Sequence, residues 1–266
     1  MEGEGRKREA AGAGRAAGVQ RRRVESWLTE CLEPGRFRDY CPNGLQVEGA
    51  PRVAVVASGV TASLAFVRAA VRAGADTLLV HHGWFWRGED PCVLGPKRER
   101  LALVLQHRLN LFAYHLPLDV HPTLGNNAQL GLRLGWRIDG RFGEEGLGCW
   151  HDLGAPHPLA ALVASLGAEL RRDPLVLGPA RRRVRRVAWC TGAAQDMLAQ
   201  AAAAGADLFV SGEVSERTTH LARELGMSYV AAGHHATERY GVQALGARLA
   251  AEFGLRHRFI DDPNPV

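Results

Sequence analysis

Long hydrophobic runs are missing from this sequence of 266 residues. No stretch approaches the roughly 18 uninterrupted apolar residues that a membrane-spanning helix requires. Residues 1–23 consist mainly of glycine, alanine and charged side chains, and they lack the apolar core of a secretion signal. We therefore expect a chain that neither crosses nor inserts into a lipid bilayer.

Paired cysteines are missing as well. The chain has five cysteines, an odd number, and they lie far apart without a Cys-x-x-Cys pair. This pattern argues against a disulfide framework and against a zinc knuckle built from thiolates. Scattered cysteines are typical of small buried side chains in a reducing compartment, so we expect a cytoplasmic protein.

A continuous basic stripe and a phosphate-binding loop are absent too. The net charge is +5, but many arginines fall into two separate runs, at 21–23 and 181–186. Solvated loops are the favoured interpretation of these runs, and DNA binding is the least favoured function. Gly59 and Gly192 follow predicted strands without a Gly-x-Gly-x-x-Gly or P-loop motif around them, so they indicate tight turns.

The residues that are present predict a globular α/β protein, because 46% of them are hydrophobic. Residues 1–20 lack apolar periodicity and are predicted to form a disordered tail. We expect a first α/β lobe at 21–139, a connector at 140–184 with its own helix, and a second α/β lobe at 185–266. The two lobes are expected to pack together as one unit.

Strand and helix patterns follow the same order in both lobes. In the first lobe, strands are predicted at 52–60, 77–82 and 110–119, and helices at 61–74, 98–107 and 126–135. In the second lobe, 186–213 predicts strand, turn, helix and strand, followed by a helix at 218–226, a strand in 227–238 and a helix ending at Gly254.

The spacing of polar residues suggests an internal duplication. His115 and Asp119 are four residues apart, and so are His234 and Glu238. The distance from His115 to Gly135 is 20 residues, which is also the distance from His234 to Gly254. The sequence therefore predicts two pseudo-duplicated α/β lobes with a ligand site in the cleft between them.

Histidines and carboxylates gather where the predicted strands end, which is where ligands bind in parallel sheets. The five candidate metal ligands are His81, His82, Asp119, His234 and Glu238. Consecutive strand residues face opposite sides, so the tandem histidines share one ion only if the chain bends at Gly83, and otherwise serve different ions. If a helix begins by His234, then His234 and Glu238 share one of its faces.

Three imidazoles and two carboxylates exceed the needs of one tetrahedral ion, so we expect a dinuclear site bridged by Asp119 or Glu238. This donor set suits two divalent transition-metal ions per chain, namely Zn, Fe, Mn, Co or Ni, better than Ca or Mg. The alternative for any single strand-end histidine is an ordinary hydrogen-bonded residue.

Other polar residues carry weaker signals. His115 and His235 are expected either to orient metal ligands by hydrogen bonds or simply to pack. Glu213 is a candidate acid or base near the metals, with a buried hydrogen-bonding role as the alternative. Asn126 and Asn127 indicate a helix start. His121, His151 and His220 are interpreted as ordinary surface or core residues.

The motifs NGLQVEG, VHHGWFW, YHLPLD, LGNN, SGEVSE, GHHATE and FIDDPNP closely resemble the NIF-three-like family, in particular its short YbgI-type bacterial branch. The resemblance runs from about residue 24 to 266. It implies a toroidal homohexamer, a trimer of dimers, with a dinuclear metal site in each cleft. The family's metal-binding positions fall on the five candidate ligands.

The resemblance also implies a function, because members are commonly named as homologues of a type 2 GTP cyclohydrolase I. We therefore expect a metal-dependent hydrolase that acts on a purine nucleotide, through a catalytic water that two ions would activate. The alternative is a non-enzymatic metal-binding or adaptor ring in metal homeostasis or regulation.

Overall fold

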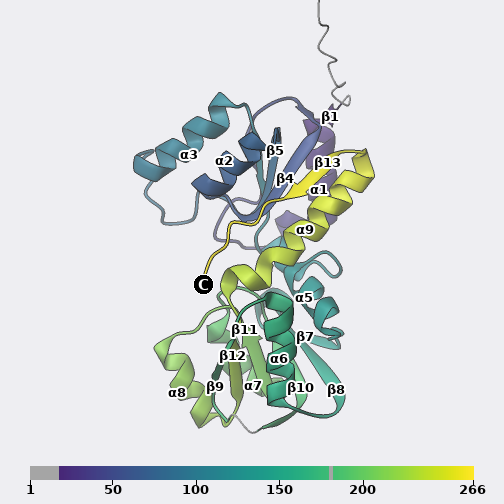
Figure 1. The fold of residues 1–266 in the computed structure, drawn as a ribbon, viewed down its shortest axis with the longest axis vertical. Helices are drawn as coiled ribbons and strands as arrows, with labels where there is room; N and C mark the ends of the chain where they lie inside the picture. Colours follow the sequence, from purple (N-terminus) through teal and green to yellow (C-terminus); the bar gives the residue numbers. More distant parts are fainter. Residues whose placement is uncertain (1–17, 180–181) are drawn as a thin grey trace, which may run out of the picture.

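The protein is an α/β structure whose two larger sheets lie one above the other along its long axis (Figure 1). The computed structural model describes residues 18–179 and 182–266. The first sheet has the order β13 (Arg256–Phe259), β4 (Val55–Thr61), β5 (Thr77–His82), β6 (Asn110–Ala113) and β2 (Gly44–Val47). The second has the order β7 (Gly140–Phe142), β8 (Gly148–Pro158), β10 (Arg183–Trp189), β11 (Leu208–Ser211), β12 (Ser228–Ala231) and β9 (Leu175–Leu177).

Both sheets have a parallel centre. Strands β13, β4, β5 and β6 are parallel, and β2 is an antiparallel edge. In the second sheet β10, β11 and β12 are parallel, between antiparallel β8 and β9. Parallel neighbours require crossover connections, which here include the helices α2 (Leu64–Arg72), α3 (Gly95–Gln106), α7 (Leu198–Ala203) and α8 (Glu216–Glu224).

The first sheet is buried on both faces, which explains the near-continuous apolar sequence of its central strand. In β5, Leu78 and Val80 enter a core with Phe66 of α2, whereas Leu79 enters the opposite core with Leu28 of α1 (Arg21–Leu32). Alternate residues of a strand point to opposite faces, so burying both faces requires apolar residues at every position.

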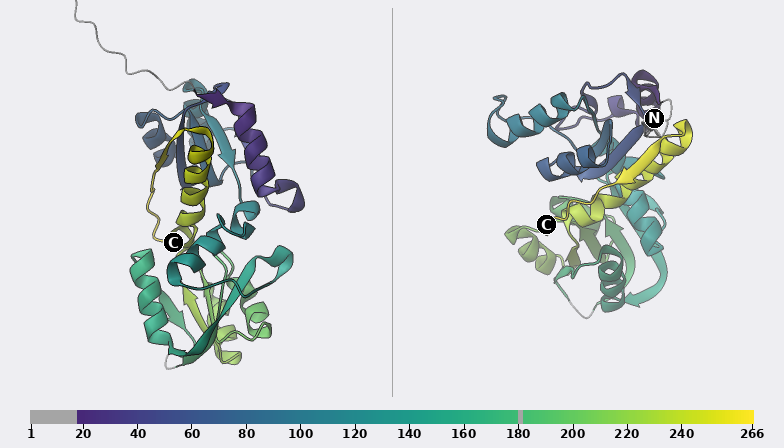
Figure 2. Two further views of the ribbon diagram at one scale, coloured as in Figure 1. Left: turned by 90° about the vertical axis from the view of Figure 1, so that its right-hand side faces the viewer. Right: turned by 45° about the horizontal axis from the view of Figure 1, so that its top comes forward.

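Helix α9 (His234–Phe253) connects the two halves of the molecule (Figures 1 and 2). Near its start, Ala236 and Tyr240 belong to a core of the second sheet. One to two turns later, Val242 and Leu245 belong to a core of the first sheet. The first turns of α9 therefore lie where the two halves meet.

The start and end of the chain differ from our expectations. Val19–Gln20 form β1, which pairs with β3 (Arg52–Val53), so the predicted disordered tail of residues 1–20 already includes a strand. Residues 1–17 of that tail lie outside the described residues. Strand β13 pairs in parallel with β4, so residues 256–259 lie in the first sheet although we assigned them to the second lobe.

Two further predictions were wrong in detail. Residues 140–184, expected to be a connector, supply β7, β8 and β9 to the second sheet, together with the expected helix α6 (Leu159–Leu170). The strand predicted at 110–119 ends at Ala113, and α4 (Leu116–Val120) follows with Pro117 in its first turn. Proline has its φ fixed near the helical value and is tolerated there, so α4 begins where we expected an extended chain.

An aspartate at the start of a parallel strand repeats in both sheets. Asp76 Oδ2 accepts hydrogen bonds from the amides of Ala54 and Val55, at 2.9 and 3.0 Å. Asp207 Oδ2 accepts from the amides of Arg185 and Arg186, at 2.8 and 3.2 Å. Each aspartate thereby connects its strand to the neighbouring parallel strand.

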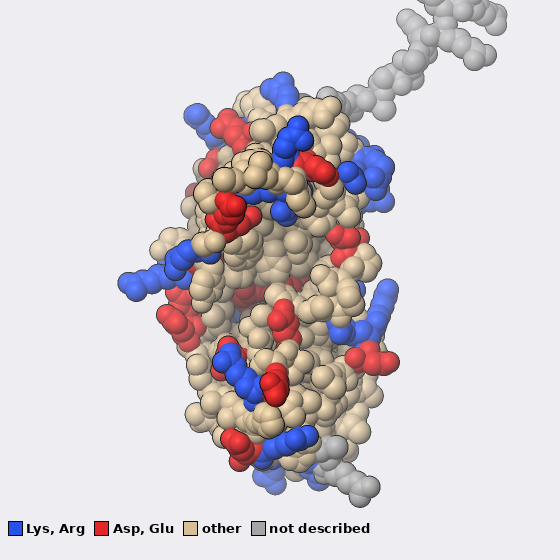
Figure 3. Space-filling model, turned by 90° about the vertical axis from the view of Figure 1, so that its left-hand side faces the viewer, with Lys and Arg blue, Asp and Glu red and all other residues tan. Residues whose placement is uncertain are grey.

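None of the helices within residues 18–179 and 182–266 is both long and apolar enough to span a membrane. Basic and acidic side chains are mixed over the face seen in Figure 3, which is hollowed near its middle.

Candidate metal centre

Three segments far apart in the sequence bring polar side chains together where the first sheet meets the start of α9. Strand β5 ends in His81 and His82, α4 carries Asp119, and the first turns of α9 carry His234 and Glu238. We call these five residues the His/carboxylate cluster. They are the five candidate ligands predicted from the sequence, and their polar atoms lie within a few ångströms of one another.

Glu238 lies at the centre of the cluster. Its Oε1 is 3.4 Å from His81 Nε2, and its Oε2 is 3.2 Å from His82 Nε2 and 3.1 Å from His234 Nε2. Asp119 Oδ1 is 3.5 Å from His81 Nε2. The cluster thus contains two groups of three ligand atoms, each within 4.8 Å, and Glu238 belongs to both.

The tandem histidines point to different sides of Glu238. His81 joins the group with Asp119, whereas His82 joins the group with His234. Their ring centroids remain only 4.5 Å apart because β5 ends here, immediately before Gly83. Both tandem histidines also belong to a third group, with His115, so the structure offers both of the arrangements considered from the sequence.

The first turn of α9 has the geometry that the sequence suggested. Gly233 has φ +97°, a conformation that side chains disfavour, and the helix begins directly after it at His234. His234 and Glu238 are therefore separated by one helical turn and share a face. The macrodipole at this end of α9 also favours negative charge.

Hydrogen bonds fix the orientation of two imidazoles. His81 Nδ1 donates to the carbonyl oxygen of Tyr114 at 2.9 Å, and His234 Nδ1 donates to Glu213 Oε1 at 2.7 Å. Each ring therefore presents an unprotonated Nε2 toward the cluster whenever it is neutral. Glu213 lies next to the cluster, as the sequence suggested, and its carboxylate acts as a hydrogen-bond acceptor for His234.

A buried asparagine supports a carboxylate of the cluster, a role that the sequence did not reveal. Asn126 Nδ2 donates to Asp119 Oδ1 at 2.8 Å, and its Oδ1 accepts from the amide of Gly241 in α9 at 3.0 Å. Asn127 Oδ1 accepts from the amide of Thr191 at 3.0 Å. Asn126 does begin helix α5 (Asn126–Leu134), as predicted, but its side chain is directed to the cluster.

The cluster contains polar atoms without partners. His81 Nε2 and Glu238 Oε2 are enclosed and have no hydrogen-bond partner among the described residues. Buried polar atoms are nearly always paired, so an additional partner would stabilise this arrangement. A cation that binds both imidazole nitrogen and carboxylate oxygen fits these donors, which is typical of divalent transition metals.

The protonation equilibria of the cluster are strongly shifted. Burial disfavours charge on His81, but Asp119 and Glu238 outweigh it and raise the pKa of His81 to about 10. Burial lowers the pKa of His82 to about 3. Burial raises the pKa of Asp119, whereas the surrounding histidines overcome burial at Glu238 and hold its pKa well below the usual range.

His115 lies beside the cluster, as expected. Its ring centroid is 5.1 Å from that of His81 and 5.1 Å from that of Trp86. His115 Nδ1 donates to Asp39 Oδ1 at 2.7 Å, and burial of Asp39 is outweighed by this bond and others, so the pKa of Asp39 is lowered to about 2. Asp39 was not predicted, because a single loop aspartate carries no spacing signal.

The remaining predicted histidines lie elsewhere. His235, expected as a possible support for ligands, donates from Nε2 to Asp261 Oδ1 at 2.8 Å and is not among the candidate ligand groups of the described residues. His121 and His151 are hydrogen-bonded away from the cluster, and His220 is exposed. Gly59 lies inside β4 against Phe66 rather than in a turn after the strand, and Gly192, in the loop after β10, lies directly against Glu238.

The sequence and the fold were compared with those of known proteins. The family model described as Duf34/NIF3 (NGG1p interacting factor 3) matches residues 19–265. A Pseudomonas aeruginosa protein named "GTP cyclohydrolase 1 type 2 homolog" is 52% identical over 238 residues, which cover 88% of this chain and 94% of the relative. An Escherichia coli K12 protein with the same name is 48% identical over 244 residues, covering 91% and 98%.

Solved structures show the same fold. The structure described as protein ybgI, of unknown function, has a TM-score of 0.88 and 47% identity, and the match covers 93% of this chain and 100% of that one. The Thermus thermophilus protein TTHA1606 has a TM-score of 0.86 and 35% identity, with the same coverage.

Proposed function

Because this chain belongs to the Duf34/NIF3 family, we propose that the His/carboxylate cluster binds two divalent transition-metal ions and that the protein is a metal-dependent hydrolase of purine nucleotides. The observation that carries this proposal is the position of Glu238, whose two oxygens face two separate groups of ligand atoms. A carboxylate in that position would be available to two cations at once.

One cation would be held by His81 and Asp119, the other by His82 and His234, and Glu238 would bind both. When bound, such ions polarise a substrate oxygen and lower the pKa of water, which is the chemistry a hydrolase needs. The enclosed His81 Nε2 and Glu238 Oε2 support this assignment, because metal coordination gives both atoms the partner they lack.

The other residues of the site would position and transfer protons. Glu213 orients His234 through Nδ1 and is already occupied as an acceptor, so we assign it a positioning role rather than that of an acid or base. His115, held at Nδ1 by Asp39, presents Nε2 as the atom that would exchange a proton with a substrate. The hollow near the middle of the face in Figure 3 is the proposed substrate entrance.

The purine nucleotide is proposed from the relatives. At about 50% identity, curated bacterial relatives carry the name "GTP cyclohydrolase 1 type 2 homolog". That name designates hydrolysis of carbon–nitrogen bonds in the guanine ring, for which an activated water and stabilisation of developing charge are required.

We further propose that the chain forms a cytoplasmic homohexamer, a trimer of dimers arranged as a ring. The exposed Leu132 and the groove it forms with Trp136 and Ile138 support an apolar contact between subunits. All five cysteines have free thiols, which supports a reducing compartment. The matched roles of Asp76 and Asp207 support a duplication that produced two similar lobes with the site in the cleft between them.

Elemental analysis of protein purified without added metal, followed by a nucleotide hydrolysis screen, tests the proposal. We expect close to two transition-metal ions per chain, loss of at least one in His234→Ala, and no loss in the surface variant His220→Ala. Formate or phosphate release from GTP or oxidised purine nucleotides should stop on chelation.

Two results would contradict the proposal in different ways. Unchanged metal content in His234→Ala would show that the residues assigned as ligands do not bind the metal. Full metal content with rapid metal exchange and no hydrolysis of any nucleotide would leave a metal-binding or adaptor protein instead of an enzyme.

A further inference from the structure

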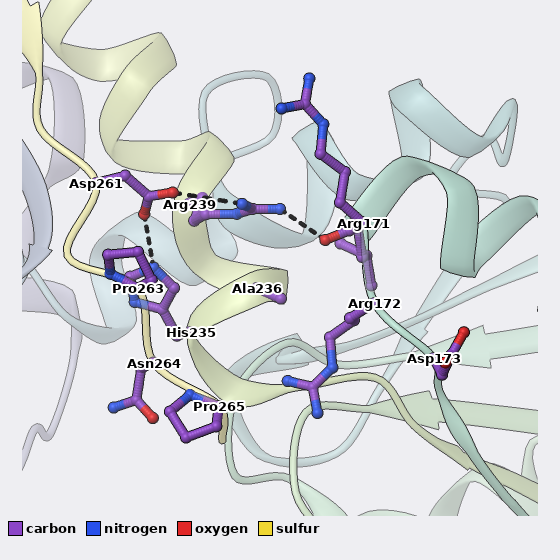
Figure 4. A pocket seen from close by; sticks show the side chains of 11 residues that line it. Arg171, Arg172, Asp173, His235, Ala236, Arg239, Asp261, Pro263, Asn264 and Pro265 are labelled. Carbon is purple, nitrogen blue, oxygen red and sulfur yellow. Dashed lines mark hydrogen bonds and ion pairs between the residues drawn. The ribbon is translucent and has the colours of Figure 1, made fainter.

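A separate pocket lies on the second half of the molecule, between the end of α6, the first turns of α9 and the segment 261–265 (Figure 4). Its volume is about 320 Å³. The polar residues that line it include Arg172, His235, Arg239, Asp261 and Asn264. The pocket shares helix α9 with the His/carboxylate cluster but contains none of its five residues.

Arg172 brings an unbalanced positive charge to this pocket. Within the described residues its guanidinium group takes part in no ion pair or hydrogen bond, and its Nε is enclosed without a partner. The side chain lies against the backbone of Gly233, where a Cβ atom would overlap Nη1. In Figure 4 it extends toward Asn264 and Pro265, without a dashed line to any neighbour.

Arg239 adds a second guanidinium group that is only partly neutralised. It donates to the carbonyl oxygen of Leu170 at 3.0 Å and lies 3.5 Å from Asp261 Oδ2. Its Nε is also enclosed without a partner. Asp261 is shared, because its Oδ1 lies 2.8 Å from His235 Nε2.

The charges within the pocket therefore do not cancel. Three guanidinium groups, of Arg171, Arg172 and Arg239, and two carboxylates, of Asp173 and Asp261, line the pocket, so the balance of these charges is +3 − 2 = +1. Asp173 is exposed and lies at the edge of the pocket in Figure 4. Positive charge that is partly removed from water without a counter-charge is unfavourable, and an anion in the pocket would relieve it.

The geometry points to an oxyanion as the ligand, and we propose that this pocket binds a phosphoryl group through Arg172 and Arg239. Guanidinium groups present paired N–H donors that match phosphate oxygens. The N-terminal end of α9 adds a favourable electrostatic field, although the amide of His235 already donates to a main-chain oxygen of Val266, the last residue given.

The phosphoryl group has two possible sources, inorganic phosphate and a nucleotide. Arg172 contacts Gly233, the residue immediately before His234 of the His/carboxylate cluster. A nucleotide phosphate in the pocket would therefore lie beside the proposed metal centre. The pocket is nevertheless defined by its own charges, so the proposal is independent of metal binding and hydrolysis.

Calorimetric titration of the full-length protein, as purified, with inorganic phosphate, GMP and guanosine tests the proposal. We expect saturable binding of phosphate or GMP, weakened about tenfold or more in Arg172→Gln. The control Arg223→Gln removes the same charge from an exposed position outside the pocket, and its affinity should stay within about twofold of wild type. GMP binding tighter than both phosphate and guanosine would identify the nucleotide as the source, whereas equal affinities for phosphate and GMP would identify the free anion.

Thermal unfolding and metal analysis of both variants separate this proposal from the previous one. Phosphate binding that persists in folded Arg172→Gln, or no saturable binding of either phosphate or GMP at millimolar concentration, would overturn the pocket's assignment. If phosphate or GMP binding depended on Arg172 in a protein that contained no metal, the phosphoryl pocket would be supported and only the proposal of a metal centre would be contradicted. Binding abolished by chelation but unchanged in Arg172→Gln would overturn the phosphoryl pocket and leave the metal centre intact.

Discussion

The Nδ1 atom of His234 lies 2.7 Å from Glu213 Oε1, and this hydrogen bond joins the start of α9 to the loop after β11. It leaves His234 Nε2 facing Glu238 Oε2 at 3.1 Å. The loop packs closely against the start of α9, since a Cβ on the preceding Gly212 would lie 2.6 Å from His234 Cα. The orientation of this imidazole is therefore set by a residue of the loop after β11.

Glu213→Gln should weaken metal binding without removing a ligand. A carboxylate that accepts from the distal nitrogen of a metal-binding histidine fixes its tautomer, and its loss costs about 10- to 100-fold in metal affinity. Competition with a chromophoric chelator measures the effect. The control is Glu216→Gln, an exposed position three residues further along the same segment. Equal affinities in the two variants would show that Glu213 does not position His234.

The fold was predictable where local pattern and burial agree. Strand β5 and the helix start at His234 follow from an apolar run and from a glycine before a polar turn. The end of β6 was not predictable. The composition of the segment is typical of an extended chain, whereas Pro117 lies in the first turn of a helix. Strand β13 was unpredictable for another reason, since its pairing with β4 depends on where α9 delivers the chain.

The candidate site was predictable to a similar degree. The five members of the His/carboxylate cluster carry a spacing signal at strand ends, and the structure brings them together. Asn126 and Asp39 carry none, because an amide at a helix start and an acid in a loop have many ordinary explanations. Their roles follow only from tertiary contacts. The bond between Asn126 and Gly241, for example, joins residues that are 115 positions apart in the sequence.

A methyl group added at Gly192 should enter the cluster. Gly192 has φ +73°, and a Cβ there would overlap Glu238 Oε1 and lie 3.3 Å from His234 Nε2. Gly192→Ala should therefore reduce metal content sharply. It should also lose about 1–2 kcal/mol of folding stability, because alanine is strained in a left-handed backbone conformation. Gly74→Ala is the matched control, because Gly74 has φ +69° with open space around it.

Elemental analysis and urea unfolding of both glycine variants distinguish the two effects. Both should lose stability, since both place a side chain at a left-handed position. Only Gly192→Ala should lose metal. Wild-type metal content in folded Gly192→Ala would mean that Glu238 is not held where the cluster requires it.

Asp207 should make stability depend on pH in the acid range. Burial raises its pKa, but hydrogen bonds from Arg182 and from the amides of β10 outweigh burial and lower the pKa below the usual value. A group with a lowered folded-state pKa contributes its full stabilisation above the unfolded value, near 3.9, and loses it as the pH falls through the folded value.

Asp207→Asn should accordingly be destabilised at neutral pH, by about 1–3 kcal/mol for the loss of charged hydrogen bonds. The difference from wild type should shrink as the pH drops from about 5 toward 3. Urea unfolding midpoints across that range measure it, with the exposed Asp173→Asn as the control for a lost surface charge. A difference that stays constant down to pH 3 would exclude the charged form of Asp207 as its cause.

Metal binding to the cluster should stabilise the fold, because its ligands come from both halves of the chain and lie together only in the folded state. A ligand at about 100 times its dissociation constant adds about 2.7 kcal/mol. For a chain of this size that corresponds to a rise in Tm of roughly 5–10 °C. Chelation should reverse the rise, and Mg²⁺ should not reproduce it, because Mg²⁺ prefers oxygen ligands.

Glu238→Gln should lose most of the rise, since Glu238 is shared by both groups of ligand atoms. Differential scanning calorimetry with Zn²⁺, Mn²⁺ and Mg²⁺ decides the matter, and an equal rise for wild type and Glu238→Gln would show that these ions bind somewhere else.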